Sequence, residues 1–190
     1  MLLLVRHGAT SLNEEGLLLG RLDPELSARG AAQARALAGW IVDPDVVISS
    51  PLRRARQTAA LLSHDVVVDE RWTELDYGPY DGRSPGAIPS GAWQRWRADP
   101  AASPRGVESL LDLGARVRNA CEALRDVAAS GVVVVVSHVS PIKAALAWAL
   151  DAPIGISWRM YVEDASVSRI DFGSDGAIVR WFNRGVFEAD

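Results

Sequence analysis

Two histidines and two arginines follow short apolar runs of the kind that end buried strands. Arg6 and His7 come directly after "LLLV", and His138 follows "VVVVVS". Arg53 comes four residues after the run "VVIS". Because the carboxyl ends of parallel strands meet at one edge of a sheet, where open α/β sheets bind their ligands, we expect these four side chains to converge.

Such a cluster suits phosphate chemistry. An arginine guanidinium matches phosphoryl oxygens with a planar fork of donors and stays charged at any working pH. A neutral imidazole can attack phosphorus while the cations stabilise the charge on the equatorial oxygens, and Gly8 lets the backbone approach an anion closely. We therefore predict that His7 is a nucleophile whose other ring nitrogen donates to a carbonyl or carboxylate that the sequence does not identify.

The departing alkoxide of a phosphate ester needs a proton. A carboxyl group beside the site could supply it, as general acids of this type do in other enzymes. Four carboxyl groups near the middle of the chain are candidates, and the residue pattern leaves the choice open: Glu70, Glu74, Asp76 and Asp81.

Alternating strand and helix patterns predict the frame that positions these residues. Apolar runs predict strands at 2–5, 46–49, 66–68, 132–137, 167–172 and 178–182. Helical spacing predicts helices over 27–41 and 107–129, the first with Ser27 as its cap. The fold class is therefore α/β, with a mostly parallel central sheet, helices on both faces and a final antiparallel hairpin.

Two further helices are predicted to begin immediately after a strand. In "SSPLRRARQTAALL" we expect Ser50 to cap a helix with Pro51 at its first position, so that Arg53 lies on the first turn. Arg54 and Arg56 are interpreted as solvated surface. In "SHVSPIKAALAWAL" the same pattern predicts Ser140 as the cap and Pro141 as the first helical residue.

Composition indicates one soluble domain over 1–190. The net charge of −4 argues against a nucleic-acid or anionic-membrane binder. Cys121 is the only cysteine, so neither an intramolecular disulfide nor a thiolate metal cluster is expected. With no segment resembling a signal peptide or a membrane span, we expect a cytoplasmic protein.

The segment 78–106 is rich in proline and glycine, and we predict a lid over one end of the sheet. Trp93 and Trp96 lie in it. They either pack beneath the lid or form an apolar wall against a leaving group.

Six motifs occur in an order that resembles the histidine phosphatase superfamily, in its phosphoglycerate mutase-like branch. They are "LVRHGATSLN", "LGRLDPELSARGAAQA", "ISSPLRRARQTA", "TELDYGPYDG", "GVESL" and "VVSHVSPIKAAL", and they cover nearly the whole chain. The resemblance implies the fold already predicted, no cofactor and no metal. It implies that His7 and Glu74 are catalytic, Glu74 as the general acid; that Arg6, Asn13, Arg53 and His138 bind phosphate; and that Gly20 offers backbone to the substrate.

Two departures from the family pattern bear on the reaction. Val139 follows the second histidine where many members have glycine, and similar "SHVTPIK" loops occur in α-ribazole phosphatase and acid phosphatase members. Ala9 stands where mutases usually have glutamate. The loop favours those phosphatase members. The missing glutamate, together with the short chain and the lack of the mutase insertions, favours release of phosphate to water over its return to a bound glycerate.

We therefore expect a metal-independent phosphomonoesterase that acts on a small-molecule phosphate monoester through a phosphohistidine. A phosphoglycerate mutase and a non-catalytic protein that binds phosphate esters are the alternatives. The oligomeric state is open, with a homodimer as one option.

Overall fold

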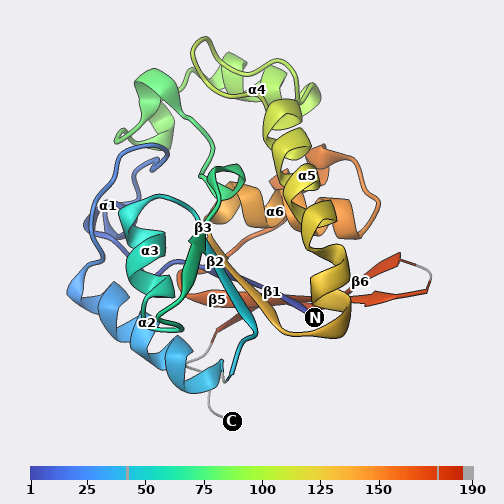
Figure 1. The fold of residues 1–190 in the computed structure, drawn as a ribbon. Coiled ribbons are helices and arrows are strands. Elements are labelled where there is room, and N and C mark those ends of the chain that lie inside the picture. Colours follow the sequence, from blue (N-terminus) through green and yellow to red (C-terminus); the bar gives the residue numbers. More distant parts are fainter. Residues whose placement is uncertain (42, 175, 186–190) are drawn as a thin grey trace.

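A six-stranded sheet forms the centre of the computed structural model, which describes residues 1–41, 43–174 and 176–185 (Figure 1). Its strand order is β3-β2-β4-β1-β5-β6. The first four strands in this order run parallel, whereas β5 pairs antiparallel with β1 and with β6. The strands are β1 (Leu2–Arg6), β2 (Val46–Ser49), β3 (Val66–Val68), β4 (Val133–Ser137), β5 (Ser166–Gly173) and β6 (Gly176–Gly185).

The apolar run of β4 explains its central place. All five of its residues are buried, and it pairs with β1 on one side and β2 on the other. A strand covered on both faces reads as a continuous apolar run, which is what "VVVV" provides. The predicted mostly parallel α/β sheet is thereby confirmed.

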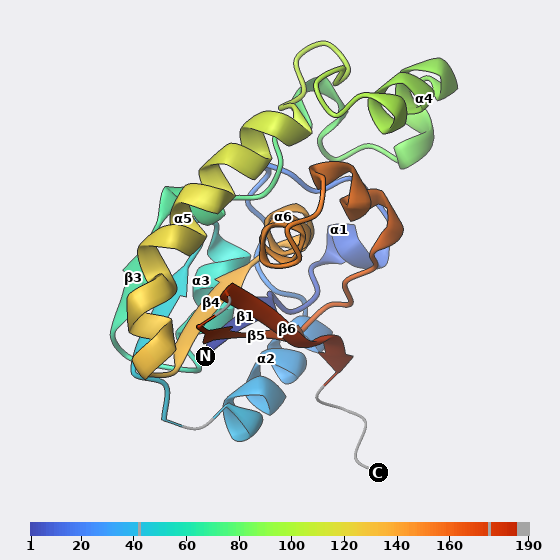
Figure 2. The same ribbon diagram turned by 90° about the vertical axis from the view of Figure 1, so that its right-hand side faces the viewer.

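Helices cover both faces of the sheet (Figure 2). Leu2 and Leu4 pack with α5 and α6, while Leu3 and Val5 pack with α2 and α3, because successive side chains of a strand point to opposite faces. The helices are α1 (Ser11–Glu14), α2 (Ala28–Trp40), α3 (Arg53–Ala59), α4 (Ser90–Ala98), α5 (Leu110–Ser130) and α6 (Val139–Ala149).

The starts of α3 and α6 differ from the prediction by two residues each. Helix α3 begins at Arg53 after an extended Leu52, because Ser50 accepts the Leu52 N–H in a local turn and does not cap the helix. Helix α6 begins at Val139, with His138 at the cap position. Ser140 is therefore the second residue of the helix and not its cap. Its free N–H, one of those that a helix leaves without a partner in its first turn, donates to the carboxylate of Glu74.

The segment 78–106 contains two short 3₁₀ helices and α4, at the opposite end of the molecule from α2 (Figure 1). Helix α4 is fixed by stacked Trp93 and Trp96, whose ring centroids are 5.5 Å apart. Trp96 is fully buried and also meets Trp158 edge-on, at 5.2 Å between centroids. Packing beneath the segment is therefore the observed role of Trp96, and the lid remains a prediction.

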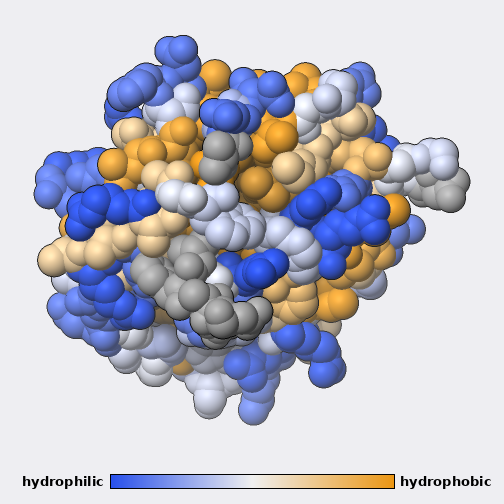
Figure 3. All heavy atoms as spheres, turned by 90° about the horizontal axis from the view of Figure 1, so that it is seen from below, coloured by the Kyte–Doolittle hydropathy of each residue, from blue (hydrophilic) through white to orange (hydrophobic). Residues whose placement is uncertain are grey.

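Seen from the α2 end, the surface mixes apolar and hydrophilic side chains (Figure 3). Cys121 is buried in α5 as a free thiol. Within the part of the chain that the structure describes, the helices are too short or too polar to cross a membrane.

Candidate active site

His7 lies directly beyond β1, and its imidazole is held in one tautomer. Its backbone N–H continues the β1–β4 pairing by donating to Ser137, and its side chain is 2% exposed. Nδ1 lies 2.7 Å from the carbonyl oxygen of Gly8, an acceptor, so Nδ1 carries the proton and Nε2 keeps its lone pair. The Gly8 carbonyl is the tautomer-fixing partner that the sequence did not identify.

Arg54, and not Arg53, faces this imidazole, so the prediction for Arg53 is wrong by one residue. The Arg54 Nε–H donates to His7 Nε2 at 3.2 Å, and the Arg54 side chain is fully buried. Arg53 is 53% exposed and pairs with Glu25 outside the pocket. Because α3 starts at Arg53, the following residue is the one that turns toward the sheet edge.

Thr58 ties α3 to the loop that carries His7. It lies one helical turn after Arg54 and donates its hydroxyl to the Arg54 carbonyl at 2.8 Å. The same hydroxyl accepts the Gly8 N–H at 3.2 Å. Helix α3 therefore fixes both the arginine and the loop beside it.

His138 lies next to His7, as predicted. The two ring centroids are 5.0 Å apart and the rings are inclined by 61°. His138 Nε2 is 2.7 Å from the hydroxyl of Ser50, while Nδ1 is buried without a hydrogen-bond partner. The two strand ends thus bring two imidazoles together.

Arg6 ends β1 and is held from the segment before β5. Its Nη1 donates to the Val162 carbonyl at 2.7 Å, and its Nη2 lies 2.6 Å from the Asp164 carboxylate. Its Nε is buried without a partner. Arg6 is close enough to both histidines for its charge to lower the pKa of each.

Burial and positive charge keep the imidazoles neutral. Desolvation lowers the pKa of His7 well below its ordinary value, and Arg54 and Arg6 lower it further. The pKa of His138 falls for the same reasons. Burial also lowers the pKa of Arg54, to about 10, so the guanidinium remains charged at neutral pH. The centre therefore combines neutral imidazoles with fixed cations.

Glu74 is the carboxylate that the structure connects to the sheet edge. It is 4% exposed, and its Oε1 accepts the backbone N–H of Leu75 at 2.7 Å and of Ser140 at 3.1 Å. The second bond attaches it to the first turn of α6, two residues from His138. Of the other candidates, Asp81 holds the loop at Gly20 and Asp76 accepts the Gly78 N–H.

Arg116, on α5, fixes the segment that carries Glu74, and sequence reasoning missed it. Its Nη1 donates to the carbonyls of Arg71 and Thr73, both at 2.7 Å, and its Nε pairs with Glu108 at 2.7 Å. Helical spacing places Arg116 on α5, but no sequence signal distinguishes it from the other arginines of that helix.

Gly20 lies in a loop that Asp81 and Arg54 hold together. The Asp81 carboxylate accepts the N–H groups of Gly20, Arg21 and Leu22 at 2.7, 2.7 and 2.8 Å. Arg54 donates to the carbonyls of Gly20 and Leu22 at 2.9 and 2.7 Å. The backbone of Gly20 is thus linked directly to the arginine of the site.

Asn13 caps α1. Its side-chain oxygen accepts from the Thr10 N–H at 3.0 Å and from the Thr10 hydroxyl at 2.8 Å. This contact orients the Asn13 amide, and its predicted contact with a phosphoryl group stays a prediction.

The arrangement can bind a phosphoryl group against guanidinium donors and present it to a neutral imidazole. The positive end of α6 and the carboxylate of Glu74 lie at the same sheet edge. Across residues 1–41, 43–174 and 176–185, no three His, Cys, Asp or Glu side chains are grouped to hold a metal ion.

Comparison with known proteins assigns the chain to a family. Residues 2–184 match the family model described as histidine phosphatase superfamily, branch 1. The bifunctional protein Rv2228c of Mycobacterium tuberculosis is 38% identical over 191 residues, covering 93% of this chain and 51% of that protein. The chain thus spans about half the length of the first curated relatives that it matches.

Two solved structures share the fold. The mycobacterial glucosyl-3-phosphoglycerate phosphatase Rv2419c, in complex with VO3, superposes with a TM-score of 0.86 at 30% identity, covering 96% of this chain and 98% of that chain. A putative α-ribazole-5′-P phosphatase from Escherichia coli has a TM-score of 0.85 at 28% identity, covering 100% and 98%. The resemblance stated from the motifs is confirmed.

Proposed function

Because the chain belongs to branch 1 of the histidine phosphatase superfamily, we propose that it is a metal-independent phosphomonoesterase that forms a phosphohistidine on His7. One observation carries the proposal: the lone pair of His7 Nε2 faces the buried Arg54 guanidinium. A phosphoryl group bound to that guanidinium would lie next to the nucleophilic nitrogen.

In the first step the phosphoryl group binds between Arg54, Arg6 and His138. A phosphoryl oxygen takes over the Arg54 Nε–H, which frees Nε2 of His7. The Nε2–P bond forms and the bond from phosphorus to the ester oxygen breaks. Glu74, in its protonated form, gives its proton to the departing oxygen.

In the second step water replaces the alcohol. Glu74, now a carboxylate, accepts a proton from the water while the water oxygen attacks phosphorus. The N–P bond breaks, phosphate leaves, and His7 regains the neutral tautomer that Gly8 fixes. The Arg6 and Arg54 cations stabilise the charge of both transition states.

The substrates are small phosphate monoesters, and the two phosphatase structures named above support this class. Asn13 and the backbone at Gly20 would add donors to the phosphoryl group. The segment 78–106 would close over the leaving group. The roles of Asn13 and Gly20 follow from the motif resemblance, and the role of the segment 78–106 from its proline- and glycine-rich sequence.

The test is phosphate release from p-nitrophenyl phosphate in the presence of a metal chelator. We expect turnover by the wild-type protein and no turnover by His7→Ala. The control His64→Gln, whose histidine lies between α3 and β3, should keep normal turnover. A phosphoenzyme trapped by denaturation at alkaline pH, where a phosphohistidine N–P bond survives, should carry its phosphate on residue 7. Turnover that needs an added metal ion, or that survives in His7→Ala, would overturn the proposal.

The same preparation separates the two alternatives. A phosphoglycerate mutase would convert 3-phosphoglycerate into 2-phosphoglycerate faster than it releases phosphate. A non-catalytic binding protein would bind vanadate tightly and release no phosphate from any ester. Ala9, which supplies no carboxylate at the mutase position, supports hydrolysis.

A further inference from the structure

Lys143 is the only lysine of the chain, whose other 19 basic side chains are arginines. It is half-buried on α6, three residues after Ser140. Residues three apart lie on the same face of a helix. Glu74 accepts the Ser140 N–H at the first turn of α6, and its carboxylate is close enough to Lys143 to act on the charge of that side chain.

A small cavity of about 60 Å³ lies between this face and the chain after Glu74. Leu75, Tyr77 and Ser140 form its wall on the side of Glu74, and Lys143 lines it from α6. Ser157 and Trp158, from the 3₁₀ helix Ile154–Arg159, contribute another part of its wall. The cavity is therefore adjacent to the carboxyl group that would protonate the leaving oxygen.

Two polar groups of this wall lack a hydrogen-bond acceptor or a countercharge among the residues that the structure describes. The Trp158 Nε1–H is buried without a hydrogen-bond acceptor. The Lys143 ammonium has no carboxylate within 4.0 Å among the described residues. Buried donors are normally satisfied, and an unsatisfied one beside a cavity suggests that a ligand supplies the acceptor.

The charges around Lys143 also favour an incoming anion. Burial lowers its pKa, the nearby Glu74 carboxylate raises it, and Arg6 lowers it again. Glu74 is already hydrogen-bonded to Leu75 and Ser140, and it is neutral when it acts as the acid. In that state the ammonium would face the cavity without any countercharge.

We propose that this cavity is a leaving-group subsite for a compact oxyanion, in which Lys143 supplies the charge and Trp158 a neutral donor. The preferred substrates are then phosphate monoesters whose alcohol carries a carboxylate, or a second phosphate, a few atoms from the ester oxygen. The inference rests on the proposed function for the position of the phosphoryl group, and it adds the substrate class.

The test compares esters of short alcohols that differ chiefly in the group at the far end. Phosphoglycolate carries a carboxylate, propane-1,3-diol bisphosphate carries a second phosphate, and 2-hydroxyethyl phosphate carries neither. We expect the wild-type protein to prefer one of the two esters with a second anionic group over 2-hydroxyethyl phosphate by at least about tenfold in kcat/KM, since a hydrogen bond to a charged group typically gives a factor of this size. Whichever of the two is preferred identifies the oxyanion.

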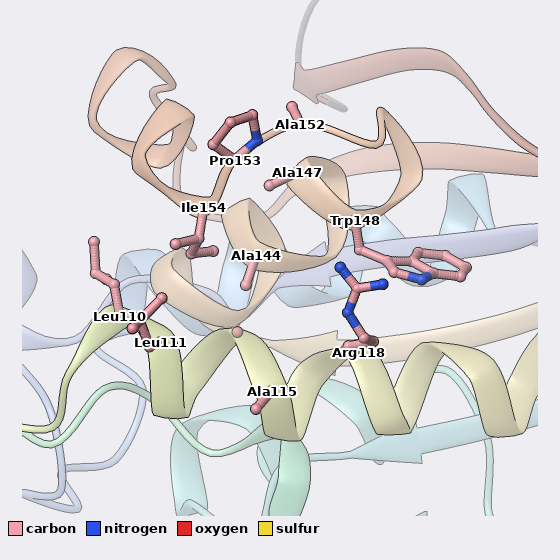
Figure 4. A pocket seen from close by; sticks show the side chains of 11 residues that line it. Leu110, Leu111, Ala115, Arg118, Ala144, Ala147, Trp148, Ala152, Pro153 and Ile154 are labelled. Atoms are coloured by element: carbon pink, nitrogen blue, oxygen red, sulfur yellow. The ribbon is translucent and has the colours of Figure 1, made fainter. Parts of the chain in front are cut away.

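Three variants assign the preference to Lys143. Lys143→Met should abolish it while leaving p-nitrophenyl phosphate turnover within about threefold, and Lys143→Arg should restore most of it. The control Arg118→Gln removes a cation from a separate hollow of about 320 Å³ between α5 and α6, where Arg118 lies beside Trp148 (Figure 4). Equal preference in wild type and Lys143→Met, or the same loss in Arg118→Gln, would overturn the subsite.

A binding measurement separates this inference from the proposed function. In the His7→Ala background, calorimetry gives the Kd of phosphoglycolate and of 2-hydroxyethyl phosphate without turnover. A Kd ratio that disappears in the double variant with Lys143→Met supports the subsite even if no ester is hydrolysed. A Kd ratio of one in the protein with Lys143 intact refutes the subsite even if phosphate release proceeds as proposed.

Discussion

Replacing Arg54 should abolish most of the activity, whereas replacing its neighbour Arg53 should not. Arg54 is buried and donates to His7 Nε2 at 3.2 Å, while Arg53 is half exposed and pairs with Glu25. In Arg54→Gln the phosphoryl group loses a positioned cationic donor. Removal of one such donor typically costs about 10²- to 10³-fold in kcat, or about 3 to 4 kcal/mol.

The same substitution should also destabilise the fold. Arg54 donates to the carbonyls of Gly20 and Leu22, and each acceptor left without a donor costs about 1 to 3 kcal/mol if it stays buried. Arg54→Lys keeps the charge but not the fork, so we expect an intermediate loss of activity. Arg53→Gln removes only an exposed ion pair, which contributes little.

The assay is kcat and KM for p-nitrophenyl phosphate, with the Kd of vanadate and the thermal midpoint measured on the same samples. A folded Arg54→Gln protein with wild-type kcat would refute the proposed role of this guanidinium in binding the phosphoryl group beside His7. So would an Arg53→Gln protein that loses activity as strongly as Arg54→Gln does.

Two further predictions concern the support of the site and its dependence on pH. An alanine Cβ at Gly30 would lie 1.9 Å from the Ala9 carbonyl oxygen, so Gly30→Ala should lower stability by about 1 to 3 kcal/mol and reduce kcat. In the same helix, a Cβ at Gly39 meets no atom within 4 Å, so Gly39→Ala should raise stability by about 0.5 to 1 kcal/mol. Urea unfolding measures both changes, and equal effects of the two substitutions would contradict the argument. Burial lowers the pKa of His7 and of His138, so as the pH falls below about 6.5 these histidines take up protons in the unfolded chain before they do so in the folded protein. The free energy of unfolding should therefore decline below that pH by up to about 1.4 kcal/mol per pH unit for each histidine. Urea unfolding between pH 7 and pH 5 checks this, with His64→Gln expected to keep the slope and a flat profile counting against neutral, buried imidazoles.

Most of the fold could be predicted because its core strands are nearly pure apolar runs. The run before Ser137 is too apolar for an exposed strand, and its burial on both faces predicts the parallel sheet that the structure contains. The first residues of α3 and α6 could not be predicted, because they depend on distant groups. The Ser140 N–H is satisfied by Glu74, 66 residues earlier in the chain, and local capping rules do not include such a partner.

The site was predictable to the level of which strand ends converge, but not which arginine enters it. His7 and His138 follow directly from the strands, so no error in helix register affects them. The arginine comes from a helix, where one residue turns a side chain by about 100°. Arg54 lies four residues before the buried Thr58, and this helical spacing is the signal that could have favoured it over Arg53.

The hydrogen bonds of Arg54 explain why one guanidinium connects so much of this site. It contacts His7 with Nε and the loop at Gly20 with Nη2, and that loop is also held by Asp81, which lies 61 positions after Gly20. Asp81 belongs to the segment 78–106 that we predict to be a lid. A substrate phosphoryl group that draws the Arg54 Nε–H away from His7 would therefore act on a guanidinium that also holds the loop leading to this segment. We therefore predict that binding of the phosphoryl group and closure of the segment 78–106 are coupled through Arg54, because its planar guanidinium moves as one unit.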